Sequence, residues 1–339
     1  MSKGFEICRF MPLLAVALLA CGCSGDRADQ AGEEARMVRF GTTRVDTRGV
    51  TGNAELQAAG SAFSVWGTCR KSGSSTIPVF DGTRVTCDGN GQWSYDEPQY
   101  WFPTFTYDFR ALHPADLPAD ASVAFAEEEA RLSVSGFDAA AGIDLLAAVP
   151  ASVTCVPDRT MGPVNLEFRH LLARVAFVGR SDEQHLGTGR RIVIDRAVLY
   201  GMRTRGDWAE EPFTDLKPGT WTPTGEPVAA ADSRYTAAAL ELATDGTNLF
   251  PGDDRMFFIP QELTDEVVLE ITYHYNYSDA AQPLQFTGRV ALGSVSERWE
   301  AGKSYRYPFT ISDRIFFETP TVEEWQYAPI NGSDFNVDL

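Results

Sequence analysis

The sequence predicts an all-β protein, and three observations support this fold class. Short runs of β-branched and aromatic residues recur along the chain, separated by Gly, Pro, Asp and Asn. Residues 267–277 alternate strictly between apolar and polar side chains, as expected of a strand with one buried face. Helical periodicity is scarce: only residues 119–130 and 137–148 contain enough Ala and Glu to indicate short helices. Many short strands that are separated by turn residues in this way are typical of antiparallel β-sandwiches.

Further strands follow from the same pattern at Phe63–Trp66, Tyr107–Leu112, Val175–Val178, Ile192–Tyr200 and Leu284–Leu292. Asp81-Gly82 and residues 88–91 supply positions that tolerate a positive φ, as tight hairpins between such strands require. A Pro-rich interruption at residues 157–163 separates two β-rich halves. We therefore expect one sandwich domain at residues 36–160 and a second at residues 161–339. Residues 204–234 are expected to form a long surface loop or a flap over the fold.

The bulk composition indicates a globular and acidic protein. The 339 residues are 44% hydrophobic and 12% aromatic, which is sufficient for two apolar cores. There are 29 Lys and Arg against 47 Asp and Glu, a formal net charge of −18. Such a surface repels phosphate backbones and the chain has no Lys/Arg-rich run, so no nucleic-acid partner is expected.

Residues 1–20 have the character of a lipoprotein signal peptide. Lys3 and Arg9 precede an apolar run over residues 10–20, which is too short to cross a bilayer because a spanning helix needs about 20 residues. The run leads into Cys21 in a sequence that resembles a lipobox, where the thiol is acylated; Cys23 is the alternative lipidation site. Residues 21–35 are then expected to form a flexible tether. The remaining alternative is a cleaved soluble signal peptide with incidental cysteines.

The chain carries no recognised catalytic or metal-binding motif. Its four His residues, His113, His170, His185 and His274, show no zinc-ligand spacing, and no nucleophile elbow, P-loop or dinucleotide turn is present. We therefore expect a protein that is not an enzyme and needs no cofactor. His170 is expected to be a partly buried structural residue. Asp253-Asp254 is a weak candidate for calcium.

Three cysteines lie in the body of the chain, at Cys69, Cys87 and Cys155. Cys69 and Cys87 flank a hairpin-like segment, so a disulfide between them and three buried thiols are both open alternatives. A cluster of aromatic residues, Trp93, Tyr95, Tyr100 and Trp101, also has two interpretations. The rings either fill the core of the first sandwich or form a platform that stacks on sugars.

An ordered set of motifs covers nearly the whole mature chain: Phe40–Arg44, Phe63–Gly67, Gly91–Tyr95, Tyr100–Pro103, Tyr107–Pro114, Asp144–Ala147, Val164–Val175, Trp299–Tyr307, Ile315 and Val322–Trp325. No single motif is specific, but the set in this order resembles the fimbrillin family. These proteins are the lipoprotein precursors of type V pili in Gram-negative anaerobes.

The resemblance implies two transthyretin-like β-sandwich domains and a mechanism of assembly. A lipidated subunit reaches the outer membrane and is cut after an Arg by a surface protease. The cut releases an N-terminal strand and leaves a groove, which an extended segment of another subunit fills by strand addition. The implied location is the outer membrane for the precursor and the cell-surface fimbrium after assembly. The resemblance implies other pilin subunits as partners, and a host glycan or host protein as a possible ligand.

The residues that this scheme needs are present. Arg44 and Arg48 follow the expected first strand at residues 37–43, and either is a candidate protease site. The last residues alternate, with Phe335, Val337 and Leu339 between polar neighbours, as a donor strand in a tail at residues 326–339 requires. The alternatives are uncut loop arginines and a frayed tail. The chain would then be a permanently anchored surface lipoprotein that binds a glycan or host ligand. Shaft, tip and anchor roles stay open.

Overall fold

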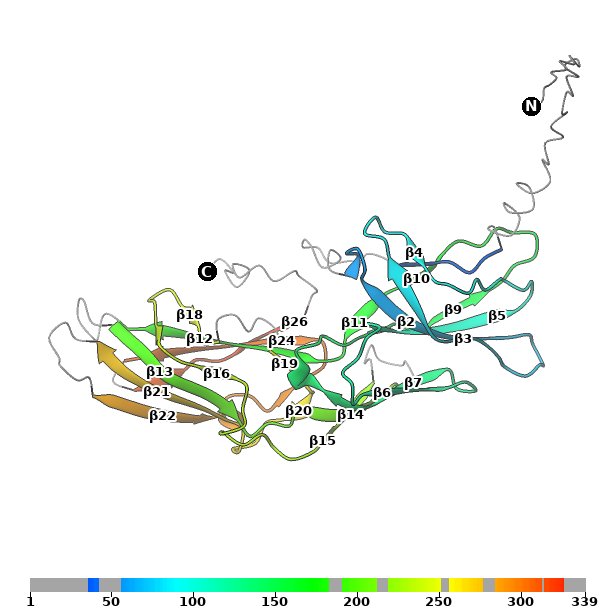
Figure 1. Ribbon diagram of the computed structural model, residues 1–339. Coiled ribbons are helices and arrows are strands. Elements are labelled where there is room, and N and C mark those ends of the chain that lie inside the picture. Colours follow the sequence, from blue (N-terminus) through cyan, green and yellow to red (C-terminus); the bar gives the residue numbers. More distant parts are fainter. Residues whose placement is uncertain are drawn as a thin grey trace, which may run out of the picture.

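The computed structural model describes residues 36–42, 56–182, 191–211, 219–250, 256–276, 284–312 and 314–325. These residues form an elongated molecule built from strands, which confirms the all-β prediction (Figure 1). Two three-residue 3₁₀ turns, η1 (Ala139–Ala141) and η2 (Leu292–Ser294), interrupt the strands. No helix in the described ranges is long and apolar enough to span a bilayer. The transthyretin-like topology of the two domains stays a prediction.

The N-terminal lobe has three layers (Figure 1). Its central sheet has the strand order β11-β8-β5-β2-β3-β4, with β9 also paired to β5. The central strands are β2 (Ala62–Arg70), β3 (Ile77–Cys87), β4 (Trp93–Ser94), β5 (Thr106–His113), β8 (Leu146–Ala148), β9 (Ala151–Thr154) and β11 (Phe168–His170). One face is covered by the parallel pair β1 (Phe40–Thr42) and β10 (Val164–Leu166). The other is covered by a four-stranded sheet.

Successive side chains of β2 point to opposite faces of the central sheet, and each face packs against a different layer. Phe63 and Val65 point into the core under β1, whereas Trp66 points into the core shared with the four-stranded sheet. That sheet has the order β15-β14-β7-β6 and consists of β6 (Ser122–Ala126), β7 (Arg131–Asp138), β14 (Arg205–Ala209) and β15 (Thr220–Thr224). A strand with both faces buried needs apolar side chains at odd and even positions, which β2 provides.

The prediction of short helices at residues 119–130 and 137–148 is wrong. The first stretch contains β6, and the second contains the end of β7, the three-residue turn η1 and β8. In β6 the half-buried Val123 and Phe125 alternate with exposed neighbours, a period of two rather than 3.6. Pairing with β7 therefore overrides the helix propensity of the alanines.

The C-terminal lobe is a sandwich of two sheets around one large apolar core. One sheet has the order β18-β12-β24-β25, with β19 on β12 and β26 on β24; the other has the order β16-β13-β21-β22, with β17 on β13. The first consists of β12 (Ala173–Ser181), β18 (Thr247–Asn248), β19 (Phe257–Phe258), β24 (Lys303–Ile311), β25 (Ile315–Phe317) and β26 (Thr321–Glu324). The second consists of β13 (Arg191–Tyr200), β16 (Thr236–Ala237), β17 (Leu240–Glu241), β21 (Val268–Asn276) and β22 (Gln285–Ala291). A small ribbon pairs β20 (Gln261–Glu262) with β23 (Arg298–Trp299).

The strand predicted at residues 267–277 is β21. Leu269, Ile271, Tyr273 and Tyr275 face the core and are at most 9% exposed, as their spacing of two predicts.

Strands from both sides of residue 160 share sheets. The segment 204–234, expected to be a surface loop or flap, instead supplies β14 and β15, and β14 pairs with β7 of the first half. Its two Trp residues, Trp208 and Trp221, are buried in the core between the sheets. The division of the chain into domains 36–160 and 161–339 stays a prediction.

The register of β2 and β3 corrects one local expectation and decides between the two alternatives for Cys69 and Cys87. Gly82 (φ +64°) lies within β3, where the register with β2 shifts, so Asp81-Gly82 forms a bulge and not a hairpin turn. Cys69 pairs with Ile77 at one end of this hairpin, whereas Cys87 lies at the other end. About eight residues of strand at about 3.3 Å each separate the two thiols, so they cannot form a disulfide. Cys69, Cys87 and Cys155 are all free and buried.

Candidate functional site

The site with functional potential is the short strand β1 and the core beneath it. In β1, Phe40, Gly41 and Thr42 pair in parallel with residues 164–166 of β10. Val38 is fully buried and Phe40 is 5% exposed, although only a few residues of this N-terminal segment contact the fold. The first strand predicted from the sequence is therefore an integral part of the N-terminal core.

Phe40 fills an aromatic socket in the central sheet. Its ring makes edge-on contacts with four others, at centroid distances from 5.4 to 6.0 Å: those of Phe63, Phe80, Tyr95 and Phe109. Such pairs add to the free energy of apolar burial. Removal of Phe40 would expose this socket, so the core depends on the segment that precedes residue 43.

Backbone hydrogen bonds hold the same segment on both sides. The amide of Val38 donates to Gln99 O (2.7 Å), and the amide of Trp101 donates to Arg36 O (2.8 Å). The Tyr95 hydroxyl donates to the Val38 carbonyl at 2.6 Å. On the other side, the amide of Val164 donates to Arg39 O at 2.7 Å. Residues 36–39 thus have backbone hydrogen-bond partners on both sides, as a strand that lies between two neighbours has.

The other residues of the expected assembly scheme fall outside the described ranges. Arg44 and Arg48 come shortly after β1 ends at Thr42, and Cys21 and Cys23 come before Arg36. The tail at residues 326–339, with Phe335, Val337 and Leu339, follows Trp325. The structure therefore shows strand β1 and the residues that pack against it, and the cleavage, lipidation and donor residues stay predictions.

The aromatic cluster weighed as a sugar platform is mostly core. Trp93 and Trp101 are 8% and 5% exposed, and the Tyr95 hydroxyl is engaged by the Val38 carbonyl. Only Tyr100 keeps an exposed face, at 40%. A single exposed ring cannot form the platform that was the alternative interpretation.

The histidines of the described ranges are tied into the fold. His170 is buried, with Nδ1 2.9 Å from Asp144 Oδ2, and His274 Nδ1 lies 2.8 Å from Asp195 Oδ1. Burial lowers the pKa of His113 to about 4. Among the described residues, no group of three or more His, Cys, Asp or Glu could hold a metal ion. His185 and Asp253-Asp254 lie outside the described ranges.

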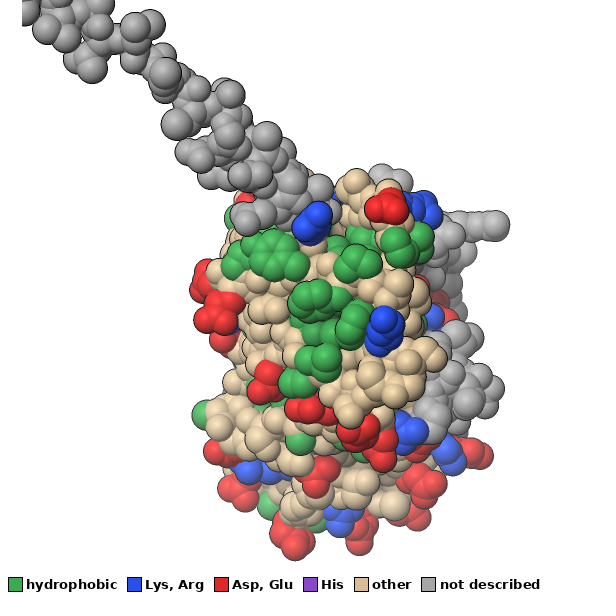
Figure 2. Space-filling view, turned by 90° about the vertical axis from the view of Figure 1, so that its right-hand side faces the viewer, with side chains coloured by type: hydrophobic (Ala, Val, Ile, Leu, Met, Phe, Trp, Pro, Cys, Tyr) green, Lys and Arg blue, Asp and Glu red, His purple; other side chains and the backbone are tan. Residues whose placement is uncertain are grey.

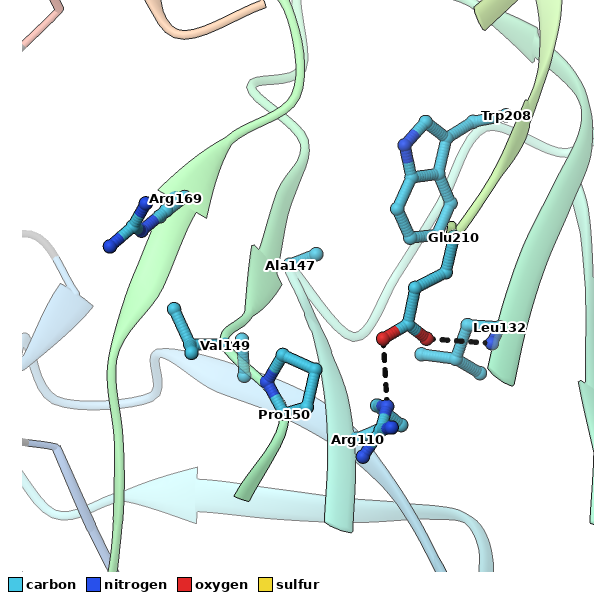
Figure 3. Close-up of a pocket in the computed structure, with 9 residues that line it drawn as sticks. Arg110, Leu132, Ala147, Val149, Pro150, Arg169, Trp208 and Glu210 are labelled. Carbon is cyan, nitrogen blue, oxygen red and sulfur yellow. Dashed lines mark hydrogen bonds and ion pairs between the residues drawn. The ribbon is translucent and has the colours of Figure 1, made fainter. Parts of the chain in front are cut away.

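A pocket lies between the central sheet and the four-stranded sheet (Figure 3). Arg110 Nε donates to Glu210 Oε1 (2.8 Å), and the amide of Leu132 donates to Glu210 Oε2 (2.9 Å). Both carboxylate oxygens are thus engaged, and the rest of the lining includes Ala147, Val149, Pro150 and Trp208. The ion pair connects the two sheets, and we assign no chemistry to this pocket. Sequence reasoning missed this pair because its partners lie 100 residues apart.

Comparison with known proteins assigns the chain to a family. A sequence model described as fimbrillin-like matches residues 43–325. A fimbrial protein from Bacteroides vulgatus has a similar structure, with 15% sequence identity, a TM-score of 0.59, and coverage of 86% of this chain and 99% of that protein. A fimbrial assembly protein from Parabacteroides distasonis matches with 11% identity and a TM-score of 0.32, over 85% of this chain and 97% of that protein.

The first of these structural similarities shows a shared fold, whereas the second is too low to support an argument. No curated protein matches the chain. The sequence match nevertheless spans most of the chain, from directly after β1 to Trp325. The chain therefore belongs to the fimbrillin-like family.

Proposed function

We propose that this chain is a structural subunit of a cell-surface fimbria and that it assembles by protease-triggered strand exchange. The observation that carries the proposal is the position of residues 36–42, which include β1 and bury Val38 and Phe40 in the N-terminal core shortly before Arg44 and Arg48. A cut after either Arg would separate β1 from the rest of the chain. The groove would then be open to another extended segment.

The C-terminal tail has the chemistry to replace β1. In the segment that leads into β1 the buried Val38 and Phe40 flank the exposed Arg39, and in the tail Phe335, Val337 and Leu339 are likewise spaced by two residues. An extended segment with this spacing presents its apolar side chains to one face. Backbone pairing with β10 would supply affinity, and the aromatic socket would supply specificity.

Delivery of the subunit is the second part of the proposal. Acylation at Cys21, or at Cys23, would hold the precursor at the outer membrane through the tether at residues 21–35. Cleavage after Arg44 or Arg48 would release the lipid together with β1, so that the subunit could join a fimbrium. Without cleavage the same lipid would be a lasting anchor.

Cleavage is tested by N-terminal sequencing of the protein recovered from intact cells. We expect the mature chain to start at Val45 or Gly49. The variants Arg44→Ala and Arg48→Ala identify the site, because only the variant at the true site keeps the acylated N-terminus. A blocked, acylated start in the wild-type protein would contradict the proposal and would indicate a permanently anchored lipoprotein.

Strand donation is tested by the formation of polymers that resist detergent in unheated samples. We expect deletion of residues 326–339 to abolish these ladders. Val337→Asp should abolish them as well, whereas Asn336→Asp adds the same charge at an outward position and should preserve them. If the processed wild-type protein stays monomeric and binds a glycan array, the proposal is wrong and the surface-binding alternative holds.

A further inference from the structure

Strand β6 forms one edge of the four-stranded sheet, and its backbone is open on that side. It pairs with β7 through five consecutive residue pairs without a bulge. On its other side, no described residue makes a backbone hydrogen bond with it. Alternate residues of an antiparallel strand direct their amide and carbonyl groups away from the neighbouring strand, so part of the backbone of β6 is available for pairing.

The opposite edge of the same sheet is protected. That edge is β15, which contains Pro223, a residue without an amide hydrogen to donate. Edge strands in natural proteins are commonly protected by Pro, by Lys or by a bulge. The sequence of β6, Ser-Val-Ala-Phe-Ala, has none of these features. Of the two edges of this sheet, β6 is therefore the one that can accept a further strand.

A pocket of about 400 Å³ adjoins β6. Its lining includes Val123 of β6, Ser64 and Trp66 of β2, Leu112 of β5, and the loop at residues 114–121. Most of the lining residues are apolar. A volume of this size is typical of a ligand site and has room for a large side chain.

A strand added to β6 would direct alternate side chains toward this pocket. Val123 and Phe125 are half-buried and pack against the core between the two sheets, whereas Ser122, Ala124 and Ala126 are exposed. Residues that lie opposite one another on neighbouring strands point to the same face of a sheet. The residue opposite Val123 on an added strand would therefore lie on the pocket side, where a large apolar side chain is favoured.

An acidic turn follows β6 directly. Glu127, Glu128 and Glu129 are all exposed, and none of them forms an ion pair with a described residue. By contrast, two carboxylates at the other end of β6, those of Asp116 and Asp120, are paired with arginines at 2.8 and 3.1 Å. Figure 2 looks onto the end of the N-terminal lobe where this turn lies and shows acidic side chains bordering hydrophobic ones. Three adjacent unpaired carboxylates favour a partner with Lys or Arg.

The C-terminal tail of this chain does not have that chemistry. Residues 326–339 contain Asp334 and Asp338 and no Lys or Arg, so the acidic turn would repel an added tail. Strand exchange at β1 is also separate in space, because β1 and the four-stranded sheet cover opposite faces of the central sheet. The edge of β6 thus suits a partner other than a second copy of this chain.

We infer that the edge of β6 binds an extended segment of a different protein by strand addition. The segment places a large apolar side chain opposite Val123 and a Lys or Arg about four residues away, beside Glu127 to Glu129. Backbone pairing supplies affinity, and the pocket and the acidic turn supply specificity. The inference goes beyond the proposed function and does not depend on cleavage after Arg44 or Arg48.

The test uses the full chain and a fluorescent peptide, Thr-Phe-Thr-Val-Thr-Lys-Thr-Lys, in an anisotropy titration. The reversed peptide is titrated as well, because an added strand can run parallel or antiparallel to β6. We expect at least one of the two to bind at least about tenfold more tightly than its version with Glu in place of Lys, and less tightly at higher salt. Binding of neither peptide, or equal binding of the Lys and Glu versions, would overturn the inference.

Strand addition is distinguished from adhesion of side chains alone by N-methylation of the binding peptide at alternate backbone amides, in two versions. Only one edge of an added strand pairs with β6, so one version should lose about tenfold or more in affinity and the other should keep it. Equal affinities of the two versions would contradict pairing along an edge.

The pocket is tested by Ala121→Leu, which places a larger side chain in its lining. We expect about tenfold weaker binding of the Phe-containing peptide. Ala124→Leu makes the same change on the exposed face of β6 and should bind the peptide as the wild type does. Equal affinities of the two variants would exclude the pocket from the site.

The acidic turn is tested by the triple variant Glu127→Gln, Glu128→Gln and Glu129→Gln, which should bind the Lys and Glu peptides equally. The control removes three exposed charges from the C-terminal lobe, with Glu262→Gln, Asp265→Asn and Glu266→Gln, and should keep the preference for Lys. Loss of the preference in both variants would show that it comes from net charge and not from this turn.

Two further titrations separate this inference from the proposed function. The unlabelled peptide of residues 326–339 should not displace the probe; displacement would show that β6 accepts the tail of this chain and would overturn the assignment of a different partner. The uncleavable variant Arg44→Ala with Arg48→Ala should bind the probe as the wild type does. Failure of strand exchange would therefore leave this result unchanged.

Discussion

Trp325 stacks face to face on His170, with the two ring centroids 3.7 Å apart and the planes 12° from parallel. Trp325 also packs on Phe257 of β19, at a centroid distance of 5.3 Å. Its backbone amide donates to the Gly302 carbonyl at 2.7 Å. The last described residue of the chain is therefore anchored in the core where the two lobes meet, directly before the proposed donor tail.

Trp325→Ala is expected to lower the free energy of unfolding by about 3–5 kcal/mol, because it removes a large buried ring and leaves a cavity. Val322→Ala in β26, three residues earlier, is the control, and a change within about 0.5 kcal/mol is expected there because Val322 is 47% exposed. Urea denaturation of both variants measures the difference. Equal effects would show that the Trp325 contacts contribute little to stability.

His113 is expected to make the protein less stable in mild acid. Desolvation lowers its pKa from 6.5 to about 4, opposed by the charge of Asp144 and assisted by that of His170. Between these two pH values the unfolded chain binds a proton that the folded chain does not. Stability therefore falls as pH drops from about 6.5 to about 4 and levels off below, by at most about 3 kcal/mol from this residue.

The test compares urea midpoints of the wild type and His113→Gln across that pH range. The amide of Gln can keep a hydrogen bond to the Ser61 hydroxyl, which lies 3.1 Å from His113 Nε2 in the wild type. We expect a shallower fall with pH in the variant. The same fall in both proteins would assign the acid sensitivity to other groups.

Local sequence patterns identified elements but not their neighbours. The alternation in β21 was sufficient to assign its buried face, because the burial of one face of a strand leaves a period of two in the sequence. The expected first strand at residues 37–43 is likewise present, as β1. The sequence could not show that β1 pairs with β10, more than 120 residues later, because register between distant strands has no local signature.

The tryptophans of the segment 204–234 illustrate the same limit. Trp208 and Trp221 stand among Pro and charged residues, which is typical of a loop. Both rings are buried because β14 pairs with β7, which lies about 70 residues earlier. The Ala-rich segment of β6 was likewise misassigned, since its strand state depends on the same sheet.

Removal of one partner of the ion pair between Arg110 and Glu210 is expected to lower the free energy of unfolding strongly. Their side chains are 13% and 8% exposed, and Glu210 also accepts from the Leu132 amide. Glu210→Ala leaves a buried guanidinium without its carboxylate, so we expect a loss of about 3–5 kcal/mol. Glu211→Ala, at the exposed neighbouring position, should cost no more than about 0.5 kcal/mol.

The double variant Arg110→Met with Glu210→Leu completes the comparison. It removes both charges and retains apolar volume, so much of the stability lost in Glu210→Ala should return. Urea denaturation of the wild type, Arg110→Met, Glu210→Leu and the double variant gives the coupling free energy between the two residues. A coupling near zero would mean that the pair does not link the two sheets.

Phe40→Ala is expected to affect the precursor and the assembled polymer differently. In the precursor the substitution empties the aromatic socket, so the free energy of unfolding should fall by about 3–5 kcal/mol. After cleavage at Arg44 or Arg48 residue 40 would be absent from the mature subunit, and polymers of the variant should match wild-type polymers in thermal stability. Arg39→Ala, at an exposed position in the same segment, should leave both forms unchanged. If variant polymers are destabilised as much as the precursor, β1 stays in place and the strand-exchange proposal is wrong.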